Sequence, residues 1–360
     1  MTSKNRLDGV DLLRGLAIFF VLMNHVNMRL RGAKIPYYHG LPEHLVNTLF
    51  WNGQQGVQIF FAVSGFLITT TAIRRWGSGI DIAGFYRLRF ARIAPLLLLL
   101  LAVLSVLHLS QIKVFVINPK VATLPRALLA ALTFNINVLE ATHGYLPANW
   151  DILWSLSVEE VFYLVFPLVR RYTKLFIGLL ITCIILGPIS RTHGNAIWRE
   201  YSYLGGMDAI ALGCLTALLI QKFRVSPKLL LALGTPLMLF TLCYYRPIGP
   251  GMTILAVGTC LIIAASAETQ WTAPRILAPL LKLGERSYEV YLTHMFIVFA
   301  LFQLFLNSSK QLKYIPILFL TTIIASALVG ELVARLYSEP LNQLLRSRTG
   351  PRPVPSVALE

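Results

Sequence analysis

Charged side chains are scarce in this sequence. Asp, Glu, Lys and Arg make up 13% of its 360 residues, whereas hydrophobic residues make up 56%. Soluble globular domains contain about 25% charged and about 45–50% apolar residues. The mean hydropathy is +0.66, and apolar runs of membrane-spanning length recur along the chain. The composition excludes a cytosolic enzyme, a disordered scaffold and a secreted disulfide-rich domain, and it indicates a polytopic membrane protein.

Acidic residues are also few, 16 against 32 basic residues, so the net charge is +16. In a soluble protein this excess would suggest nucleic-acid binding. Here the basic residues lie in short segments between apolar runs, where they set the orientation of the spans. We therefore expect no nucleic-acid partner.

Cysteines are few as well. The four, all within apolar runs and without CxxC spacing, are Cys183, Cys214, Cys243 and Cys260. They are typical of small core residues and indicate neither a disulfide nor a metal site. A cleavable signal peptide is not indicated either. The first apolar stretch contains Arg14, Asn24 and His25 and ends in no small-residue cleavage site, so we interpret it as a retained helix.

The apolar runs predict an all-α transmembrane bundle of about ten spans. The expected spans are 12–29, 55–73, 93–110, 153–170, 174–190, 204–221, 228–245, 251–267, 288–306 and 314–336. A further candidate, 123–140, is interrupted by Arg126, Asn135 and Asn137. If it spanned, Arg170, Arg171 and the basic cluster at 222–228 would move to the outer side, against the positive-inside rule. We therefore predict ten spans with both termini in the cytoplasm, and an outer segment 111–152 that is partly re-entrant or interfacial.

The domain organisation is correspondingly simple. Residues 1–345 are expected to form one transmembrane domain, and 346–360, which contain three prolines, a disordered tail. With no further domain expected after the tail, the membrane unit would work alone or with a separate partner.

Two polar residues stand out in the first span. Arg14 and His25 are eleven positions apart, about 1100° of helical rotation and about 16 Å of rise, which places them near one stripe of the helix. A snorkelling arginine and a histidine bonded to a neighbouring helix would be the structural explanation. Because charges within a span cost about 2.5–3.5 kcal/mol each, the shared stripe favours a functional one.

Two further segments allow both kinds of explanation. Small residues in Ala62-Val63-Ser64-Gly65 permit close helix packing. Arg89 and Arg92 are neighbours on one helical face. Their guanidinium groups suit phosphate, although positive-inside anchoring explains them equally well.

The most unusual segment is Trp154-Ser155-Leu156-Ser157-Val158-Glu159-Glu160, which places two adjacent carboxylates inside a span. Adjacent residues point about 100° apart, so we expect one carboxylate to face the bundle interior and the other an outer loop. A structural ion pair is the alternative. His294, in a span that begins with Ser287-Tyr288, is by itself more typical of a core histidine.

Taken together, these residues resemble the acyltransferase-3 family of membrane acyltransferases over essentially the whole chain. The resemblance is carried, in order, by Leu7-Asp8-Gly9, Arg14 with His25, Phe60-Phe61-Ala62-Val63-Ser64-Gly65-Phe66, Arg89-Phe90-Ala91-Arg92, Trp154-Ser155-Leu156-Ser157-Val158-Glu159-Glu160, Gly284-Glu285-Arg286-Ser287-Tyr288 with His294, and Glu339-Pro340.

The resemblance implies transfer of an acyl group, usually acetyl, from cytoplasmic acyl-CoA to a hydroxyl. Acceptors in the family include cell-envelope polysaccharides, peptidoglycan sugars, exported glycans and some small metabolites. Some members carry a periplasmic esterase-like domain, so a separate periplasmic acyl-accepting protein is a possible partner besides membrane lipids. A bacterial inner (plasma) membrane fits best.

The expected roles follow from this chemistry. Arg14, Arg89 and Arg92 would bind the nucleotide phosphates of acetyl-CoA or another acyl-CoA. His25 would act as general base or as a transient acyl carrier, oriented by Glu159. The candidates for substrate binding are Ser64, Trp154, Glu160, Tyr288 and His294. No metal is expected.

Intramembrane Arg, His and Glu also occur in transporters and proton relays. An exporter of an acyl group, glycan or small metabolite without its own chemistry is therefore the alternative. However, the sequence shows no convincing inverted repeats or broken helix pairs of the kind typical of transporters. A structural scaffold would not explain a cation and an imidazole on one stripe.

Overall fold

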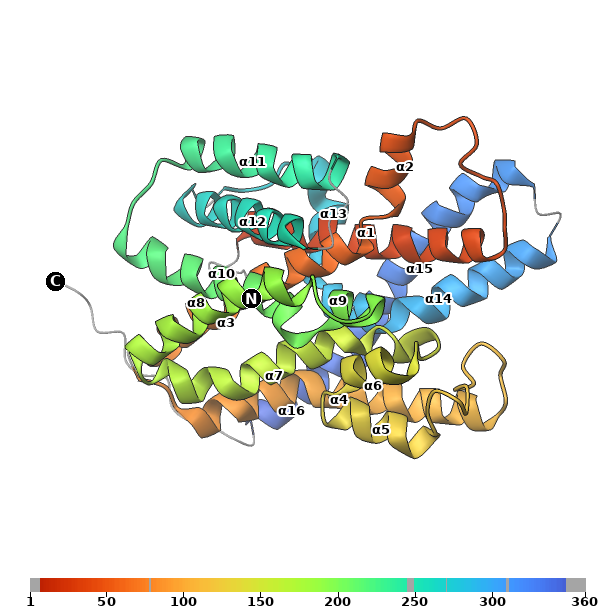
Figure 1. Ribbon diagram of the computed structural model, residues 1–360, viewed down its shortest axis with the longest axis horizontal. Helices are drawn as coiled ribbons and strands as arrows, with labels where there is room; N and C mark the ends of the chain where they lie inside the picture. The colour runs from red at the N-terminus through yellow and green to blue at the C-terminus, as the bar shows by residue number, and fades with distance from the viewer. Residues whose placement is uncertain (1–6, 78, 245–248, 270, 309–310, 348–360) are drawn as a thin grey trace.

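The computed structural model describes residues 7–77, 79–244, 249–269, 271–308 and 311–347, and this part of the chain is helical (Figure 1). The long helices are α1 (Asp8–Gly32), α3 (Gly53–Trp76), α4 (Ile82–Leu109), α7 (Leu153–Arg170), α8 (Thr173–Ser190), α10 (Tyr203–Lys222), α11 (Pro227–Cys243), α12 (Pro250–Thr269), α14 (Ser287–Asn307) and α15 (Ile315–Val333). The shorter elements are α2 (Glu43–Phe50), α5 (Leu124–Leu132), α6 (Ile136–His143), η1 (Ala148–Trp150), α9 (Ala196–Tyr201), η2 (Arg275–Leu277), α13 (Ala278–Glu285), η3 (Leu312–Tyr314), η4 (Ala334–Ser338, a π-helix) and α16 (Glu339–Ser347).

The long helices match the predicted spans. Within the described residues, nine helical segments are long and apolar enough to cross a membrane, and α11, with 17 residues, is a shorter apolar helix at the remaining predicted span. The prediction of an all-α polytopic bundle with about ten spans is confirmed.

The ambiguous segment 123–140 forms two short helices, α5 and α6, instead of one spanning helix. The break falls at Thr133–Asn135, where Phe134 takes a positive φ of 55°. Few non-glycine residues adopt this left-handed conformation, and it cannot continue an α-helix. As predicted, the segment does not cross the membrane as a single helix.

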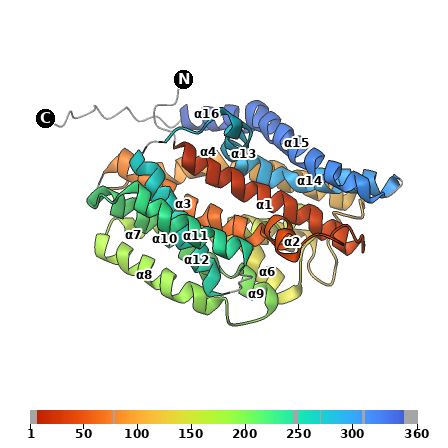
Figure 2. The same cartoon turned by 90° about the horizontal axis from the view of Figure 1, so that it is seen from above.

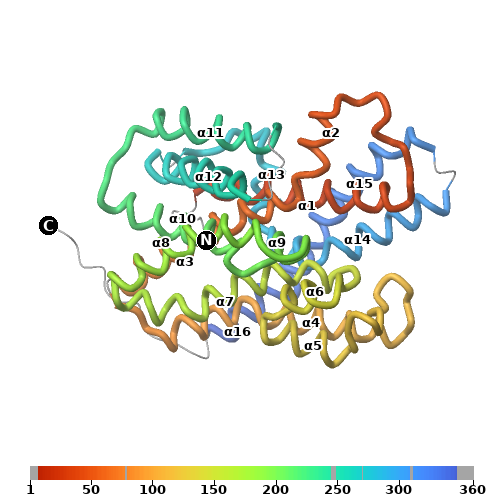
Figure 3. The backbone as a smooth tube through the Cα atoms, in the orientation of Figure 1, coloured from red at the N-terminus to blue at the C-terminus, as the bar shows by residue number. Residues whose placement is uncertain are grey.

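Helix α1 passes through the middle of the bundle, which places its polar residues in the interior (Figures 1 and 2). It packs against α3, α13 and α14. The short helices α2, α5 and α6 lie toward one end of the bundle, on the right in the tube view (Figure 3).

Glycines allow α3 and α10 to approach closely, as the small residues of the α3 motif predict. A methyl group on Gly65 would lie 1.9 Å from the Ile210 carbonyl oxygen, and one on Gly213 would lie 2.0 Å from the Ala62 carbonyl oxygen. The two contacts are reciprocal, so each helix uses a glycine to admit the backbone of the other.

The C-terminal boundary differs from the sequence expectation. The helix α16 continues through Arg346 to Ser347, although the disordered tail was expected to begin at residue 346. The rest of the expected tail, residues 348–360, lies outside the described residues.

Candidate active site

A cavity of about 440 Å³ lies between α1, α3, α4, α7, α14 and α16. Its charged and polar lining comprises Arg14, Ser64, Thr71, Arg75, Arg89, Arg92, Ser155, Glu159, Tyr163, Ser287, Tyr288, Tyr291 and Arg346. The structure thus gathers Arg14, Arg89 and Arg92 with three more of the predicted residues, Ser64, Glu159 and Tyr288.

Arginines concentrate at one end of this cavity. Arg75 and Trp76 are the last residues of α3, and Arg346 lies near the end of α16. Arg346 is close enough to Arg92 and Arg75 for their charges to interact. Like charges held together in a partly enclosed space attract anions, so this end of the cavity suits a polyanionic ligand such as a phosphorylated nucleotide.

Arg89 is held by both carboxylates of α7. Its Nη2 lies 2.7 Å from Glu160 Oε1 and 3.7 Å from Glu159 Oε2. Its guanidinium also lies over the Tyr163 ring, 3.8 Å from the centroid. The helix α4 begins at Ile82, well before the predicted span at 93, which carries Arg89 into the bundle far enough to meet α7.

The expectation that one carboxylate faces the bundle interior holds for Glu159, which lines the cavity, but Glu160 meets Arg89 of α4 instead of the expected outer loop. One guanidinium contacts both, because its fork is wide enough to bridge side chains that leave the helix about 100° apart. Glu160 is 6% exposed and forms a buried ion pair, as in the alternative of a structural ion pair. Glu159, in contrast, lines the cavity.

A serine lies between a tyrosine and Glu159 in the cavity wall. The Tyr163 hydroxyl donates to Ser64 Oγ at 2.6 Å, and Ser64 lies close enough to Glu159 to interact with its carboxylate. Glu159 is therefore surrounded by Ser64 and Arg89 in the cavity wall.

His25 and His294 form a pair between α1 and α14. His25 Nδ1 lies 3.2 Å from His294 Nε2, and the ring centroids are 4.9 Å apart. His294 is fully buried, whereas His25 is partly exposed. This pair corrects the expected pairing of His25 with Glu159. The helix α1 packs on α14, while α7 packs on α4, α6, α8 and α10.

The partners of the two rings determine their tautomers. His25 Nδ1 lies 2.9 Å from the Val21 carbonyl oxygen, and His294 Nδ1 lies 2.6 Å from the Tyr291 carbonyl oxygen. A carbonyl oxygen only accepts, so in the neutral rings each Nδ1 carries the proton. His25 Nδ1 then shares its one proton between the Val21 carbonyl oxygen and His294 Nε2, in a bifurcated hydrogen bond, and His25 Nε2 keeps its lone pair available to take a proton.

Tyr291 connects this pair to the cavity. Its ring contacts His294 with centroids 5.7 Å apart, and its hydroxyl lies 2.7 Å from Ser155 Oγ. Both Tyr291 and Ser155 line the cavity. The cavity therefore extends from the arginines to Tyr291, while His25 and His294 lie beyond this side chain and do not line the cavity.

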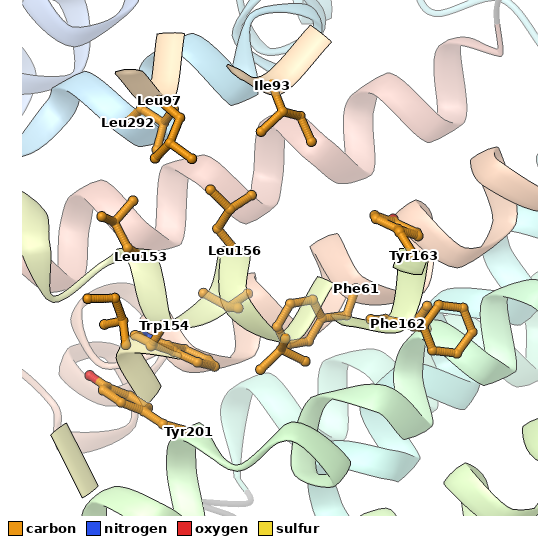
Figure 4. Close-up of a cluster of buried hydrophobic side chains, with 14 of the residues drawn as sticks. Phe61, Ile93, Leu97, Leu153, Trp154, Leu156, Phe162, Tyr163, Tyr201 and Leu292 are labelled. Carbon is orange, nitrogen blue, oxygen red and sulfur yellow. The ribbon is translucent and has the colours of Figure 1, made fainter. Parts of the chain in front are cut away.

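Trp154 has a packing role instead of the predicted substrate contact. It is 4% exposed and stacks on Tyr201 with centroids 4.2 Å apart, and its other neighbour is the Phe61 ring at 6.1 Å. Figure 4 shows Trp154 and Tyr201 face to face, on the side of α7 away from Leu97 and Leu292.

Sequence reasoning did not single out Arg75, Arg346, Ser155 or Tyr291 as site residues. Arg75 and Arg346 were interpreted only as basic residues that set the topology, and the cavity shows that such residues can line a site as well. Tyr291 is one helical turn from His294, and this spacing was the available signal.

Comparison with known proteins agrees with this architecture. A family model described as an acyltransferase domain, that of the acyltransferase-3 family, matches residues 7–334. The chain belongs to the acyltransferase-3 family, whose members are membrane-embedded acyltransferases. Membership favours an enzyme over the exporter considered from the sequence.

Among curated proteins, the chain is 26% identical to the O-acetyltransferase OatA of Staphylococcus aureus (strain NCTC 8325 / PS 47), over 95% of this chain and 58% of that protein. It is 25% identical to the peptidoglycan O-acetyltransferase OatA of Listeria monocytogenes, over 81% of this chain and 49% of that protein. The chain thus spans less than two thirds of the length of these relatives. No solved structure matches it.

Proposed function

We propose that this protein transfers an acetyl or other short acyl group from cytoplasmic acyl-CoA to a hydroxyl of a cell-envelope or exported glycan. One observation carries the proposal: an arginine-lined cavity inside the helix bundle reaches Tyr291, whose ring contacts the pair formed by His294 and His25. The arginines suit the phosphates of the donor, and the histidines suit the proton transfer that acylation of a hydroxyl requires.

The donor side is assigned to the cytoplasm, because acyl-CoA is supplied there. The helix ends that carry Arg75, Arg92 and Arg346 are cytoplasmic in the orientation favoured by the positive-inside rule, with both chain termini inside. Arg14, Arg92, Arg75 and Arg346 bind the phosphates, while Arg89 is held by its carboxylates in the cavity wall. The thioester arm then lies along α1 toward Tyr291 and Ser155, over the roughly 16 Å rise between Arg14 and His25.

His25 handles the proton. Its Nε2 takes the proton of the acceptor hydroxyl as the hydroxyl oxygen attacks the thioester carbon, and the carbon–sulfur bond breaks. The protonated His25 then returns a proton to the departing thiolate of CoA. His294 supports this step, because its Nε2 accepts a hydrogen bond from His25 Nδ1 and stabilises the cationic ring.

A two-step route uses the same residues. His25 Nε2 attacks the thioester carbon, the carbon–sulfur bond breaks and CoA leaves as its thiolate. The acceptor hydroxyl then attacks the acyl carbon, the carbon–nitrogen bond breaks, and the hydroxyl proton passes through the released imidazole to the thiolate. The routes differ in whether an acyl-histidine accumulates when acyl-CoA is added without acceptor.

The acceptor is proposed from the relatives. Their names describe O-acetyl transfer, in one case to peptidoglycan, so a glycan hydroxyl of the cell envelope is the acceptor proposed here. We propose a bacterial inner membrane as the location. Because the relatives are longer than this chain, a separate periplasmic acyl-accepting protein is a further proposed partner.

The proposal is tested with purified protein in lipid nanodiscs. Binding of acetyl-CoA is measured by calorimetry, and release of CoA is followed by its thiol, for wild type, His25→Ala and Arg92→Ala. Two matched controls are available: His193→Ala, an exposed histidine after α8, and Arg87→Ala, an exposed arginine on the same helix as Arg92.

Loss of charge-assisted bonds worth about 1.5–3 kcal/mol should weaken acetyl-CoA binding in Arg92→Ala by about 10- to 150-fold. His25→Ala should bind acetyl-CoA normally but lose turnover, and both controls should match wild type. Mass spectrometry of the quenched enzyme distinguishes an acylated His25 from the direct route. A folded wild type that does not bind acetyl-CoA would refute the proposal.

A further inference from the structure

A second cavity, of about 290 Å³, opens at the other end of α3. Its lining includes Trp51, Gln54, Gln55, Gln58, Arg199 and Met252. It lies beside the first turns of α3, α10 and α12, whereas the arginine-lined cavity follows α3 to its last residue, Trp76. From Gln54 to Arg75 the helix rises about 32 Å, close to the thickness of the hydrocarbon core of a bilayer. The two cavities therefore belong to opposite sides of the membrane.

Charge is balanced within the wall of this cavity. Arg191, 3% exposed, pairs with Asp208 at 2.6 Å. It also donates to Thr253 Oγ1 and to the carbonyl oxygens of Gly205 and Gly249, so its guanidinium is saturated. At the rim, Arg199 lies close enough to Glu200 for their charges to interact. The cavity consequently has no excess charge with which to select an ion.

Two polar atoms of the lining have no hydrogen-bond partner within the described part of the chain. One is Gln55 Oε1, an acceptor on a side chain that is 7% exposed, and the other is Arg199 Nε, a donor. A buried polar atom left unpaired is costly. Phosphate and carboxylate only accept, and an ammonium group only donates. A hydroxyl group does both, so a hydroxylated ligand is the class that matches this pair of an acceptor and a donor.

We propose that this second cavity binds one sugar residue of a neutral glycan. The amides of Gln54 and Gln55 offer donors and acceptors for its hydroxyls, while Trp51, Met252 and Phe61 offer apolar surface for its carbon-bound hydrogens. The guanidinium of Arg31 lies 5.1 Å from the Trp51 ring centroid, which holds this ring at the rim.

The position of Phe61 relates this cavity to acyl transfer. This residue lines both cavities, so the sugar site and the donor cavity approach each other at Phe61. The sugar site would hold one sugar residue of a glycan at the outer face. A hydroxyl on another sugar of the same glycan would then meet the acyl group. This acceptor role rests on the proposed function, whereas binding of a neutral glycan does not.

The test measures glycan binding in lipid nanodiscs, which avoids sugar-based detergents. The probes are maltotriose, the trimer of N-acetylglucosamine and the acidic trimer of galacturonic acid. Variants Gln55→Leu and Trp51→Ala are compared with two matched controls, Gln303→Leu on the exposed face of α14 and Trp271→Ala in an exposed loop. Melting temperatures verify that each variant is folded, and acetyl-CoA binding is recorded on the same samples.

At least one neutral trimer should bind wild type more tightly than the acidic trimer does. Gln55→Leu and Trp51→Ala should each weaken that binding at least about 10-fold, as expected when a buried polar contact or an aromatic contact is lost. The controls should not weaken it, and acetyl-CoA binding should be unchanged in all four variants. The site is refuted if no neutral trimer binds folded wild type, or if both cavity variants bind as wild type does. Intact glycan binding without acetyl-CoA binding would instead refute the proposed donor and leave this site standing.

Discussion

Replacement of His294 tests whether the histidine pair works as a unit. In the structure, His294 accepts a hydrogen bond from His25 Nδ1 at 3.2 Å and donates its own Nδ1 proton to the Tyr291 carbonyl oxygen. His294→Phe keeps a ring of similar size but removes the acceptor. The His25 ring then keeps only its bond to Val21, 2.9 Å away, and loses the partner that stabilises its cationic form.

The size of the effect follows from the hydrogen bond that is lost. When His25 takes a proton, its bond to His294 becomes charge-assisted, and such a bond contributes about 1.5–3 kcal/mol. At about 1.4 kcal/mol per factor of ten, this corresponds to about a 10- to 150-fold lower rate. The loss should appear in kcat and leave the KM for acetyl-CoA nearly unchanged, because His294 lies away from the arginines that bind the phosphates.

The assay is CoA release under steady-state conditions, with His294→Gln as the conservative variant. A glutamine side chain can still accept from His25, so it should recover part of the activity that phenylalanine loses. His193→Phe, at an exposed position, is the matched control. Wild-type kcat in a folded His294→Phe, with His25→Ala inactive, would refute this account of the pair.

Three further predictions concern stability. Glu140→Gln should reduce the loss of stability at high pH. The reason is that burial, and then the neighbouring carboxylate of Asp151, raise the pKa of Glu140 above its ordinary 4.5. The folded chain then binds this proton more strongly than the unfolded chain does, so stability falls as pH rises above about 4.5, and the fall in melting temperature from about pH 5 to about pH 8 should be smaller in the variant. Asp208→Ala should destabilise the protein by about 3–5 kcal/mol in denaturant unfolding, because it leaves the buried charge of Arg191 unpaired. Gly65→Val should separate α3 from α10, since even a methyl group would lie 1.9 Å from the Ile210 carbonyl oxygen, and size-exclusion chromatography should show loss of the folded form.

Matched controls make these outcomes specific. Glu268→Ala breaks an ion pair with Arg224, which is 82% exposed, so it should cost at most about 1 kcal/mol. Gly178→Val adds a side chain where no atom lies within 4 Å, so the protein should fold. Equal destabilisation by Asp208→Ala and Glu268→Ala, normal folding of Gly65→Val, or an unchanged pH dependence in Glu140→Gln would contradict the corresponding prediction.

The helical architecture could be predicted from the sequence because membrane helices are governed by local properties. A run of about 20 apolar residues is long enough to span a bilayer, and a spanning helix satisfies its own backbone hydrogen bonds. The residues of each predicted span therefore coincide or overlap with a long helix. The polar interruptions in 123–140 correctly indicated that this segment is not a single spanning helix. The family could also be inferred, because its motifs combine rare intramembrane residues such as Arg14, His25 and Glu159 in a fixed order.

The partners of those residues depended on tertiary structure. Whether His25 meets Glu159 or His294 depends on which helix packs against α1, and this choice is made by close contacts such as those between glycines and facing backbones. The same holds for Arg89, which reaches both carboxylates only because α4 packs against α7. The cavity that joins arginines from four helices, and the second cavity beside Gln55, are spaces between elements far apart in the chain. Local sequence determines which segments become helices, but the site exists only where their side chains meet.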